Sequence, residues 1–244
     1  AQTSLFGEQS DEVYQELIIP NAPEWQNLEK LKREKEVVGI YLSGHPLDDF
    51  KKEIHWFTNR ALANLKDLKP LINKNINVAG IINDFEFLES RNGKQWCKFT
   101  MEDFSDQYEF RIFGEEFLKF KHFININQFV RLRLNVREGW RNQETGRIGD
   151  PRIQFLSFEM LHEAINNNSK KLTLKFDIRN LQAERILRLK NELNRFKGDK
   201  PVCFDIIDSE KPLKLTLNSR KQKVSISPEL LDHLENNDWV YKLN

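Results

Sequence analysis

Residues 130–137 read VRLRLNVR, so apolar and polar side chains alternate strictly along this stretch. A period of two residues predicts a β-strand with one apolar face for a core and one opposite face, which here is basic. Three earlier segments alternate in the same way, at residues 76–82, 96–101 and 109–113. A last strand is predicted near residues 153–159, which gives five strands between Ile76 and Leu161.

The segment between the third and fourth predicted strands has the character of a helix. It covers residues 114–122 and carries Phe117 and Phe120. Five strands with one helix between the third and the fourth is the order of the OB fold, a small closed β-barrel. The sequence therefore predicts an OB-fold domain over residues 75–162.

The flanking regions read as attachments to this barrel. Residues 1–23 are poor in pattern and predict a flexible segment. Residues 24–74 predict a helical connector, because apolar side chains recur at helical spacing on both sides of Pro46. Residues 163–170 include three consecutive asparagines and predict a linker.

Residues 171–244 predict a small α+β domain. Its expected strands are 172–176, 202–207, 213–217, 224–226 and 239–243, with helices at 181–197 and after Ser227-Pro228. The predicted order is βαβββαβ. The whole chain is thus expected to be mostly β, with an α+β domain at its end.

Composition excludes several classes of protein. The net charge is +1, so the chain as a whole is neither basic nor acidic. No apolar run approaches the roughly 20 residues that span a bilayer, and no secretory signal is present. Cys97 and Cys203 are expected as core thiols, and the scattered histidines give no metal-ligand spacing. We expect a cytoplasmic protein without metal, cofactor or membrane contact, cut from a longer chain because Ala1 stands where an initiator Met would.

A short segment near the start can act as a docking peptide. It reads Gln2-Thr3-Ser4-Leu5-Phe6. The Gln2 amide can form hydrogen bonds, while Leu5 and Phe6 can fill adjacent apolar pockets on a partner. The alternative is a tail whose two apolar side chains pack on the domain behind it.

The predicted outer face of the barrel carries cations and flat rings. They lie on the second to fourth strands and in the two loops that OB folds use for oligonucleotides: Arg91, Lys94, Trp96, Lys98, Arg111, Arg131, Arg133, Arg137, Trp140 and Arg141. Single strands require cations for phosphates and rings for bases. The barrel as a whole is not basic, however, and its arginines could instead pair with nearby glutamates. Nucleic-acid binding and a protein-docking role remain equally supported by these residues alone.

No catalytic group is predicted. His45 in Gly44-His45-Pro46 is best explained as part of a turn, because no nearby nucleophile or carboxylate would make it a base. The pairs Glu102-Asp103 and Glu115-Glu116 end a strand and open a helix, where acids are structural.

Residues 34–47 read EKEVVGIYLSGHPL, which resembles a long signature of the bacterial replicative DNA polymerase, the α subunit of DNA polymerase III. In that family the signature precedes an OB domain, as it does here. Residues 78–81, 93–94, 99–103 and 109–113 resemble the family's first three barrel strands and first loop. The Gln2–Phe6 segment stands where the family carries its internal sliding-clamp-binding peptide.

This resemblance implies a non-catalytic C-terminal fragment of a DNA-directed DNA polymerase. Gln2, Ser4, Leu5 and Phe6 would bind the sliding clamp, and the barrel would hold single-stranded template. Trp96 and Trp140 would stack on bases while the lysines and arginines of the outer face meet phosphates. The family also places docking of the clamp-loader τ subunit on the domain that residues 171–244 occupy.

Two alternatives remain open. The barrel could serve only protein docking within the replisome. It could also be an anticodon-binding module of a tRNA-acting enzyme, although such a module has no use for the Gln2–Phe6 segment.

Overall fold

The computed structural model describes residues 23–141, 146–208, 210 and 213–244, and the side chain of Leu213 is not described. The chain divides into two compact units, residues 1–44 and residues 45–244. None of the helices in the described ranges is both long enough and apolar enough to cross a membrane.

The first unit contains one helix, α1 (Asn27–Val38), among its described residues. The helix ends at Gly39, whose φ of 86° is the left-handed conformation that glycine adopts without strain. The chain then turns back, and the Glu34 carboxylate accepts hydrogen bonds from the backbone of Leu42 (3.1 Å) and Ser43 (2.9 Å). These bonds, led by one from the Ser43 hydroxyl, lower the pKa of Glu34. The signature residues thus build a tight helix-to-loop turn.

The second unit begins with the connector that leads to the sheet. It comprises η1 (Asp48–Phe50), α2 (Lys51–Phe57), η2 (Leu62–Lys66) and η3 (Lys69–Leu71). His45 belongs to the turn before α2, since its Nδ1 accepts a hydrogen bond from the backbone N–H of Leu47 at 3.1 Å. Leu47 itself is fully buried. The predicted structural role of His45 is confirmed.

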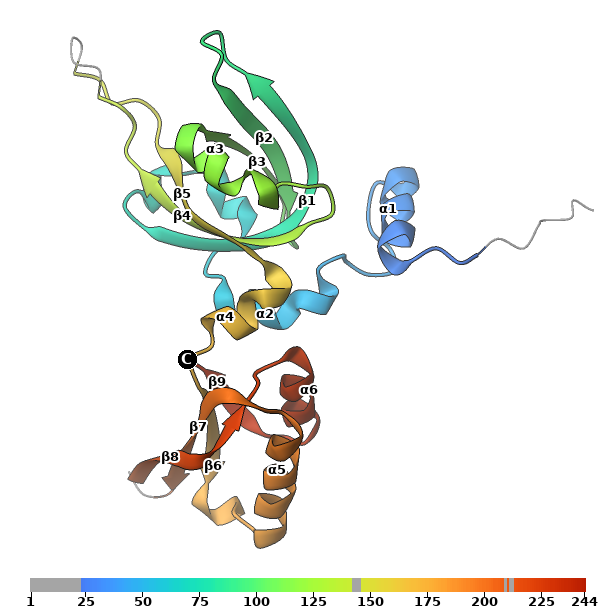
Figure 1. The fold of residues 1–244 in the computed structure, drawn as a ribbon, viewed down its shortest axis with the longest axis vertical. Helices are drawn as coiled ribbons and strands as arrows, with labels where there is room; N and C mark the ends of the chain where they lie inside the picture. The colour runs from blue at the N-terminus through green and yellow to red at the C-terminus, as the bar shows by residue number, and fades with distance from the viewer. Residues whose placement is uncertain (1–22, 142–145, 209, 211–212) are drawn as a thin grey trace, which may run out of the picture. The chain divides into compact units, whose positions relative to one another are not determined.

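Five antiparallel strands form the larger sheet (Figure 1): β1 (Asn75–Glu89), β2 (Gln95–Glu102), β3 (Gln107–Phe113), β4 (Phe129–Arg137) and β5 (Arg152–Met160). Their order across the sheet is β3-β2-β1-β4-β5. Helix α3 (Gly114–Phe120) and the turn η4 (Lys121–Phe123) lie between β3 and β4 in sequence. Five strands with a helix between the third and fourth are confirmed, and Phe117 and Phe120 are both buried in the core.

Strand β1 is long because it pairs with two neighbours. Its first half pairs with β4 and its second half with β2, and the register shifts between Ile82 and Asp84. Gly80 lies at the point where the partners change. A Cβ atom there would come within 2.3 Å of the Glu102 backbone oxygen, so only glycine allows the strands to approach this closely.

The prediction of a closed barrel is wrong in one respect. Within the described residues no hydrogen-bonded ladder joins the edge strands β3 and β5. The Glu116 carboxylate on α3 instead accepts a hydrogen bond from the backbone N–H of Phe155 on β5. A side chain therefore takes the place of part of the missing ladder, and the five strands form a strongly curved sheet.

Aromatic rings fill the space inside this curved sheet. Phe99 of β2 lies 5.2 Å from Phe110 of β3, 6.2 Å from Phe155 and 6.0 Å from Phe158 of β5, measured between ring centroids. The predicted core position of Cys97 is also confirmed, since the residue is fully buried and burial raises the pKa of its thiol to about 11. The core thus joins both edges of the sheet through side chains.

The chain leaves the sheet through η5 (Leu161–Glu163) and α4 (Ala164–Asn168). Ala164 and Ile165 are buried, so part of the segment predicted as a linker is a packed helix. Ala164 and Leu161 form a small apolar cluster with Leu47 and with Ala79 on the outer face of β1.

The second sheet has four strands: β6 (Leu172–Asp177), β7 (Lys197–Asp208), β8 (Leu213–Val224) and β9 (Val240–Leu243). Its order is β8-β7-β6-β9, with β6 and β7 parallel. Between strands come η6 (Ile178–Asn180), α5 (Ala183–Arg195) and α6 (Pro228–Asn236). Ser227 caps α6 as predicted, accepting a hydrogen bond from the Leu230 N–H.

The predicted order βαβββαβ is wrong by one strand, and the observed order is βαββαβ. Residues 213–217 and 224–226 were expected as separate strands, but β8 runs through to Val224. Its pairing with β7 shifts register between Cys203–Asn218 and Pro201–Lys223. The extra polar residues of β8, between Asn218 and Lys223, form a β-bulge. The strand therefore continues through the segment where the alternation of side chains is interrupted.

Candidate nucleic-acid interface

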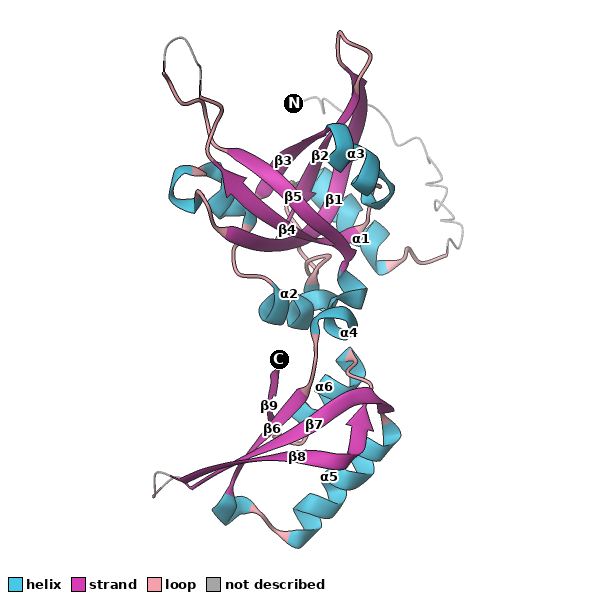
Figure 2. Ribbon diagram, turned by 60° about the vertical axis from the view of Figure 1, so that its left-hand side comes forward, coloured by secondary structure: helices cyan, strands magenta, loops and turns pink. Residues whose placement is uncertain are grey.

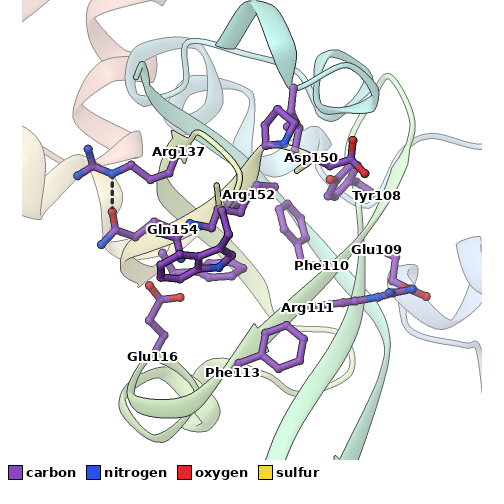
Figure 3. A pocket seen from close by; sticks show the side chains of 15 residues that line it. Tyr108, Glu109, Phe110, Arg111, Phe113, Glu116, Arg137, Asp150, Arg152 and Gln154 are labelled. Carbon is purple, nitrogen blue, oxygen red and sulfur yellow. Dashed lines mark hydrogen bonds and ion pairs between the residues drawn. The ribbon is translucent and has the colours of Figure 1, made fainter. Parts of the chain in front are cut away.

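A groove of about 810 Å³ lies between the edge strands β3 and β5 (Figure 3). Its walls come from both faces of β3, from the start of β5 and from the connection between β4 and β5. Figure 3 shows Arg137, Gln154 and Glu116 on one side of the groove and Glu109 and Arg111 on the other. The groove therefore occupies the place where a closed barrel would have its last ladder.

Trp140 is the most exposed ring of the groove. Its side chain is 75% exposed, and the guanidinium carbon of Arg152 lies 4.0 Å from the ring centroid. A guanidinium over an indole face is a favourable cation–π contact, which orients the ring. An exposed, oriented ring at a groove is a suitable platform for a flat partner.

Two glycines allow the backbone to present Trp140. The Gly149 N–H donates to the Trp140 carbonyl oxygen at 3.0 Å, which pairs the two sides of the connection. A Cβ atom on Gly139 would lie 2.1 Å from the Gly149 oxygen. The close approach at the base of this connection thus depends on glycine at position 139.

Three arginines line the groove, and each already has a partner. Arg111 Nε donates to Glu109 at 3.0 Å, and Arg137 Nε donates to Gln154 at 3.0 Å. Arg152 lies against Trp140. Only the Arg111 contact is an ion pair with a side chain of the same strand, and Arg111 is exposed, so screening by salt weakens it.

Glu116 is the half-buried acid of the groove. Burial raises the pKa of its carboxyl, while the Phe155 N–H and the charge of Arg152 lower it. Sequence reasoning assigned Glu116 to the helix dipole alone. Its position between α3 and β5 gives it the further role of bridging the open edge.

The predicted residues on β2 lie beside the groove. Trp96 stacks on Phe113, which lines the groove, with 5.0 Å between ring centroids. Lys98 Nζ lies 2.7 Å from the Glu86 carboxylate, and this hydrogen bond raises the pKa of Lys98. The ring pair extends the aromatic surface, whereas Lys98 is paired within the sheet.

The predicted loop residues are exposed. Arg91 and Lys94 lie in the β1–β2 hairpin, where Gly93 adopts a φ of 70°. Arg141 is exposed as well, and its Nε lies 3.4 Å from the Gly146 oxygen. Figures 1 and 2 show this hairpin and the described part of the β4–β5 connection extending from the same end of the sheet.

The two arginines in the first half of β4 lie elsewhere. Arg131 was expected on the solvent-exposed face, and this expectation is wrong, since the residue is 6% exposed. It donates to the Phe57 carbonyl oxygen of α2 (2.8 Å), to Glu159 of β5 (2.7 Å) and to Asn168 of α4 (3.2 Å). Helices α2 and α4 cover this part of the sheet, so Arg131 holds them together. Arg133 is exposed but does not line the groove.

Several groove residues were not predicted as site residues from the sequence: Tyr108, Phe113, Glu116, Arg152 and Gln154. Arg152 could have been found, because it follows Pro151 at the start of the last predicted strand, in the arginine-rich part of the chain. Tyr108 and Phe113 could not, since their exposure depends on β3 being an unpaired edge.

The remaining predicted site residues, Gln2, Ser4, Leu5 and Phe6, lie outside the described residues. Within the described ranges no group of three or more His, Cys, Asp or Glu side chains is arranged to hold a metal ion.

Comparison with known proteins gives one consistent family. Residues 161–244 match the family described as the DNA polymerase III alpha subunit, C-terminal domain. The chain is 26% identical over 182 residues to the DNA polymerase III subunit alpha of Pseudomonas aeruginosa, which covers 75% of this chain and 15% of the relative. It is 29% identical over 231 residues to that of Borreliella burgdorferi, covering 89% of this chain and 19% of the relative.

A third relative, from Campylobacter jejuni, is 34% identical over 114 residues, which is 46% of this chain and 9% of the relative. The matches thus span less than a fifth of the length of each of these three relatives. On these matches, the chain is similar to bacterial DNA polymerase III α subunits, and its residues 161–244 match the C-terminal domain of that subunit.

Proposed function

We propose that the five-stranded sheet is an OB-type module that binds single-stranded DNA, and that the chain is a non-catalytic part of a DNA-directed DNA polymerase. The observation that carries this proposal is Trp140, an exposed ring oriented by Arg152 at the rim of a groove lined by Arg111 and Arg137. Rings for bases and cations for phosphates are what sequence-tolerant single-strand binding requires.

The geometry supports single strands over duplexes. The groove opens between two edge strands, and its floor is formed by the ring of Phe110 and by side chains of β5. One strand with unstacked bases can place a base against Trp140, whereas paired bases in a duplex are already stacked. Phe113 and Trp96 offer a second ring surface for the next base along the strand.

Replacement of Trp140 by Ala is expected to weaken binding of a labelled oligothymidine strand about tenfold. Stacking of one base on an aromatic ring contributes about 1–3 kcal/mol, and about 1.4 kcal/mol corresponds to a factor of ten. Fluorescence anisotropy in a salt series measures the effect. Trp25→Ala is the matched control, because Trp25 is also exposed (63%) but lies in the first unit.

Equal binding by wild type and W140A would contradict the proposal and favour a barrel used only for protein docking. A preference for RNA of the same sequence over DNA would favour an anticodon-binding module. Loss of binding in both tryptophan variants would show that the effect does not belong to the groove.

We further propose that Gln2–Phe6 tethers the chain to the sliding clamp and that residues 171–244 dock the clamp-loader τ subunit. The first rests on the sequence and the family alone. The second is supported by an apolar groove of about 480 Å³ between α5 and the four-stranded sheet. Ile186 and Leu217 line it and are 49% and 44% exposed, which is unusual for branched apolar side chains that serve only a core.

The two docking sites are expected to fail independently. Leu5→Ala/Phe6→Ala should lower affinity for the purified clamp at least tenfold and leave binding of τ unchanged. Ile186→Asp should do the reverse, because it places a charge in the apolar groove. Surface plasmon resonance with both partners on both variants makes each variant the control for the other. A variant that affects both partners, or neither, would contradict the assignment of its site.

A further inference from the structure

Among the described residues, no helix covers one of the two faces of the four-stranded sheet. Leu189 and Leu193 of α5 pack in one core with Leu230, Leu231 and Leu234 of α6 and with Leu172, Leu174, Val202 and Leu243 of the sheet. Figure 1 shows both helices on the same side of the strands. Because side chains alternate across a sheet, the intervening residues of each strand face the other way.

The uncovered face is rich in lysine. Strand pairing sets Thr173 beside Lys242 and beside Cys203, and Cys203 beside Asn218. In the neighbouring row Lys175 pairs with Asp205 and Asp205 with Thr216. Lys214 pairs with Ile207 and Lys223 with Pro201 at the two ends of the β7–β8 ladder. Three strands, β6, β8 and β9, therefore bring four lysines to one surface, and Lys171 joins them just before β6.

A depression of about 430 Å³ lies at the centre of this face. Lys171, Lys214 and Lys242 line it together with the hydroxyl-bearing side chains of Thr173 and Thr216. Thr173 and Cys203 form its floor and are only 5% and 3% exposed. Cations at the rim are the donors that a phosphate group binds, and the Thr173 hydroxyl lies below them.

One acid lies within the depression. Asp205 lies 3.2 Å from Lys214 Nζ and accepts a hydrogen bond from the Thr216 hydroxyl at 2.7 Å, and these contacts lower its pKa. Its charge is thus shared between Lys214 and a hydroxyl. Across the described residues of this face, lysines outnumber carboxylates, since Asp205 and Asp177 stand against Lys171, Lys175, Lys214, Lys223 and Lys242.

The face differs from the groove of the five-stranded sheet in one respect that decides its ligand. The aromatic residues of this domain pack with the covered core: Phe176, Phe196, Phe204, Trp239 and Tyr241. The described part of the uncovered face therefore offers cations and hydroxyls but no ring on which a base could stack. Such a surface recognises phosphates and is indifferent to sequence and to strandedness.

We propose that the uncovered face of the four-stranded sheet is a second DNA-binding site, which holds the sugar–phosphate backbone through Lys171, Lys214 and Lys242. This site is separate from the proposed single-strand groove, because no residue of the groove contributes to it. It accepts duplex DNA, which the groove does not favour.

The test uses a blunt-ended duplex of about 20 base pairs and the whole chain. The variant is Lys171→Gln/Lys214→Gln/Lys242→Gln. It should lower the negative slope of log affinity against log salt by about 2 to 3 and weaken binding at low salt on the order of tenfold or more. The matched control, Arg188→Gln/Lys190→Gln/Arg195→Gln, removes the same charge from exposed positions on α5.

Each outcome decides the proposal. Loss of affinity and of salt slope in the first variant, with the control close to wild type, supports it. Equal loss in both variants would show that only net charge matters, and an unchanged slope or no duplex binding by the wild type at low salt would overturn it. Trp140→Ala should leave duplex binding unchanged, so failure of the single-strand proposal is separable from failure of this one. Circular dichroism confirms that each variant is folded.

Discussion

Replacement of Arg131 by Met is expected to lower the free energy of unfolding by about 3–5 kcal/mol. The side chains of Arg131 and Glu159 are only 7% and 14% exposed, and their atoms lie 2.7 Å apart. Removing the guanidinium leaves a carboxylate buried without its cation, and it also removes the donor to the Phe57 carbonyl oxygen. Chemical denaturation followed by tryptophan fluorescence measures the loss.

Two further variants show whether the loss comes from the orphaned charge. Arg133→Met changes an exposed arginine two residues along the same strand and should alter stability by less than about 0.5 kcal/mol. Arg131→Met/Glu159→Gln should recover part of the loss, because a neutral amide is less costly to bury than a carboxylate. If the double variant were as unstable as the single one, the ion pair would not be the reason.

Replacement of Phe99 by Ala is expected to destabilise the five-stranded sheet by about 3–5 kcal/mol. Phe99 is 1% exposed and contacts rings of both edge strands, Phe110 on β3 and Phe155 and Phe158 on β5. No backbone ladder among the described residues joins these edges, so the ring cluster carries their association. A cavity at Phe99 therefore weakens the sheet at the place where hydrogen bonds cannot compensate.

The matched control is Phe87→Ala on β1, since Phe87 is 53% exposed. It should cost less than about 1 kcal/mol, whereas Phe99→Leu should recover part of the stability that Phe99→Ala loses. The same denaturation experiment compares all three. Similar losses for Phe87→Ala and Phe99→Ala would contradict the central role of the ring cluster. Hydrogen exchange should also rise first in β3 and β5 of the Phe99 variant.

The strands of the larger sheet could be predicted from the sequence because burial on one face imposes alternation directly on the residues. Leu132 and Leu134 are fully buried, as the pattern requires. The alternation of side chains could not show that β3 and β5 would remain unpaired with each other. Nor could it show that the Glu116 side chain would bind the backbone of β5 instead. Closure depends on contacts between residues far apart in the chain, which periodicity does not record.

Arg131 shows the limit of the same pattern for the site. Alternation correctly places it opposite the core, but a second layer, α2 and α4, covers that face. A polar position on a strand is therefore exposed only if nothing packs over it. Trp140, in contrast, follows the strand in a loop with glycine and arginine, where rings have little to pack against, and it is exposed.

In the smaller domain, two separate strands were expected at 213–217 and 224–226. The structure instead has one strand, β8, with a β-bulge. Polar residues such as Arg220 and Lys221 interrupt the alternation, and sequence reasoning divided β8 there. The backbone of β8 nevertheless keeps pairing with β7 on both sides. Interruption of a side-chain pattern does not end a strand whose neighbour continues.

The hydrogen bonds of Arg131 to Phe57 and Asn168 have a mechanical consequence. Phe57, where the chain enters the five-stranded sheet, and Asn168, where it leaves, are both bound by one guanidinium. The sheet is therefore a side branch of the chain, and its entry and exit are clamped together. Tension applied between residue 45 and residue 170 would load the clamp first and reach the strands only after it opened. A pull between these two points would leave the strands unstretched as long as the hydrogen bonds of Arg131 hold.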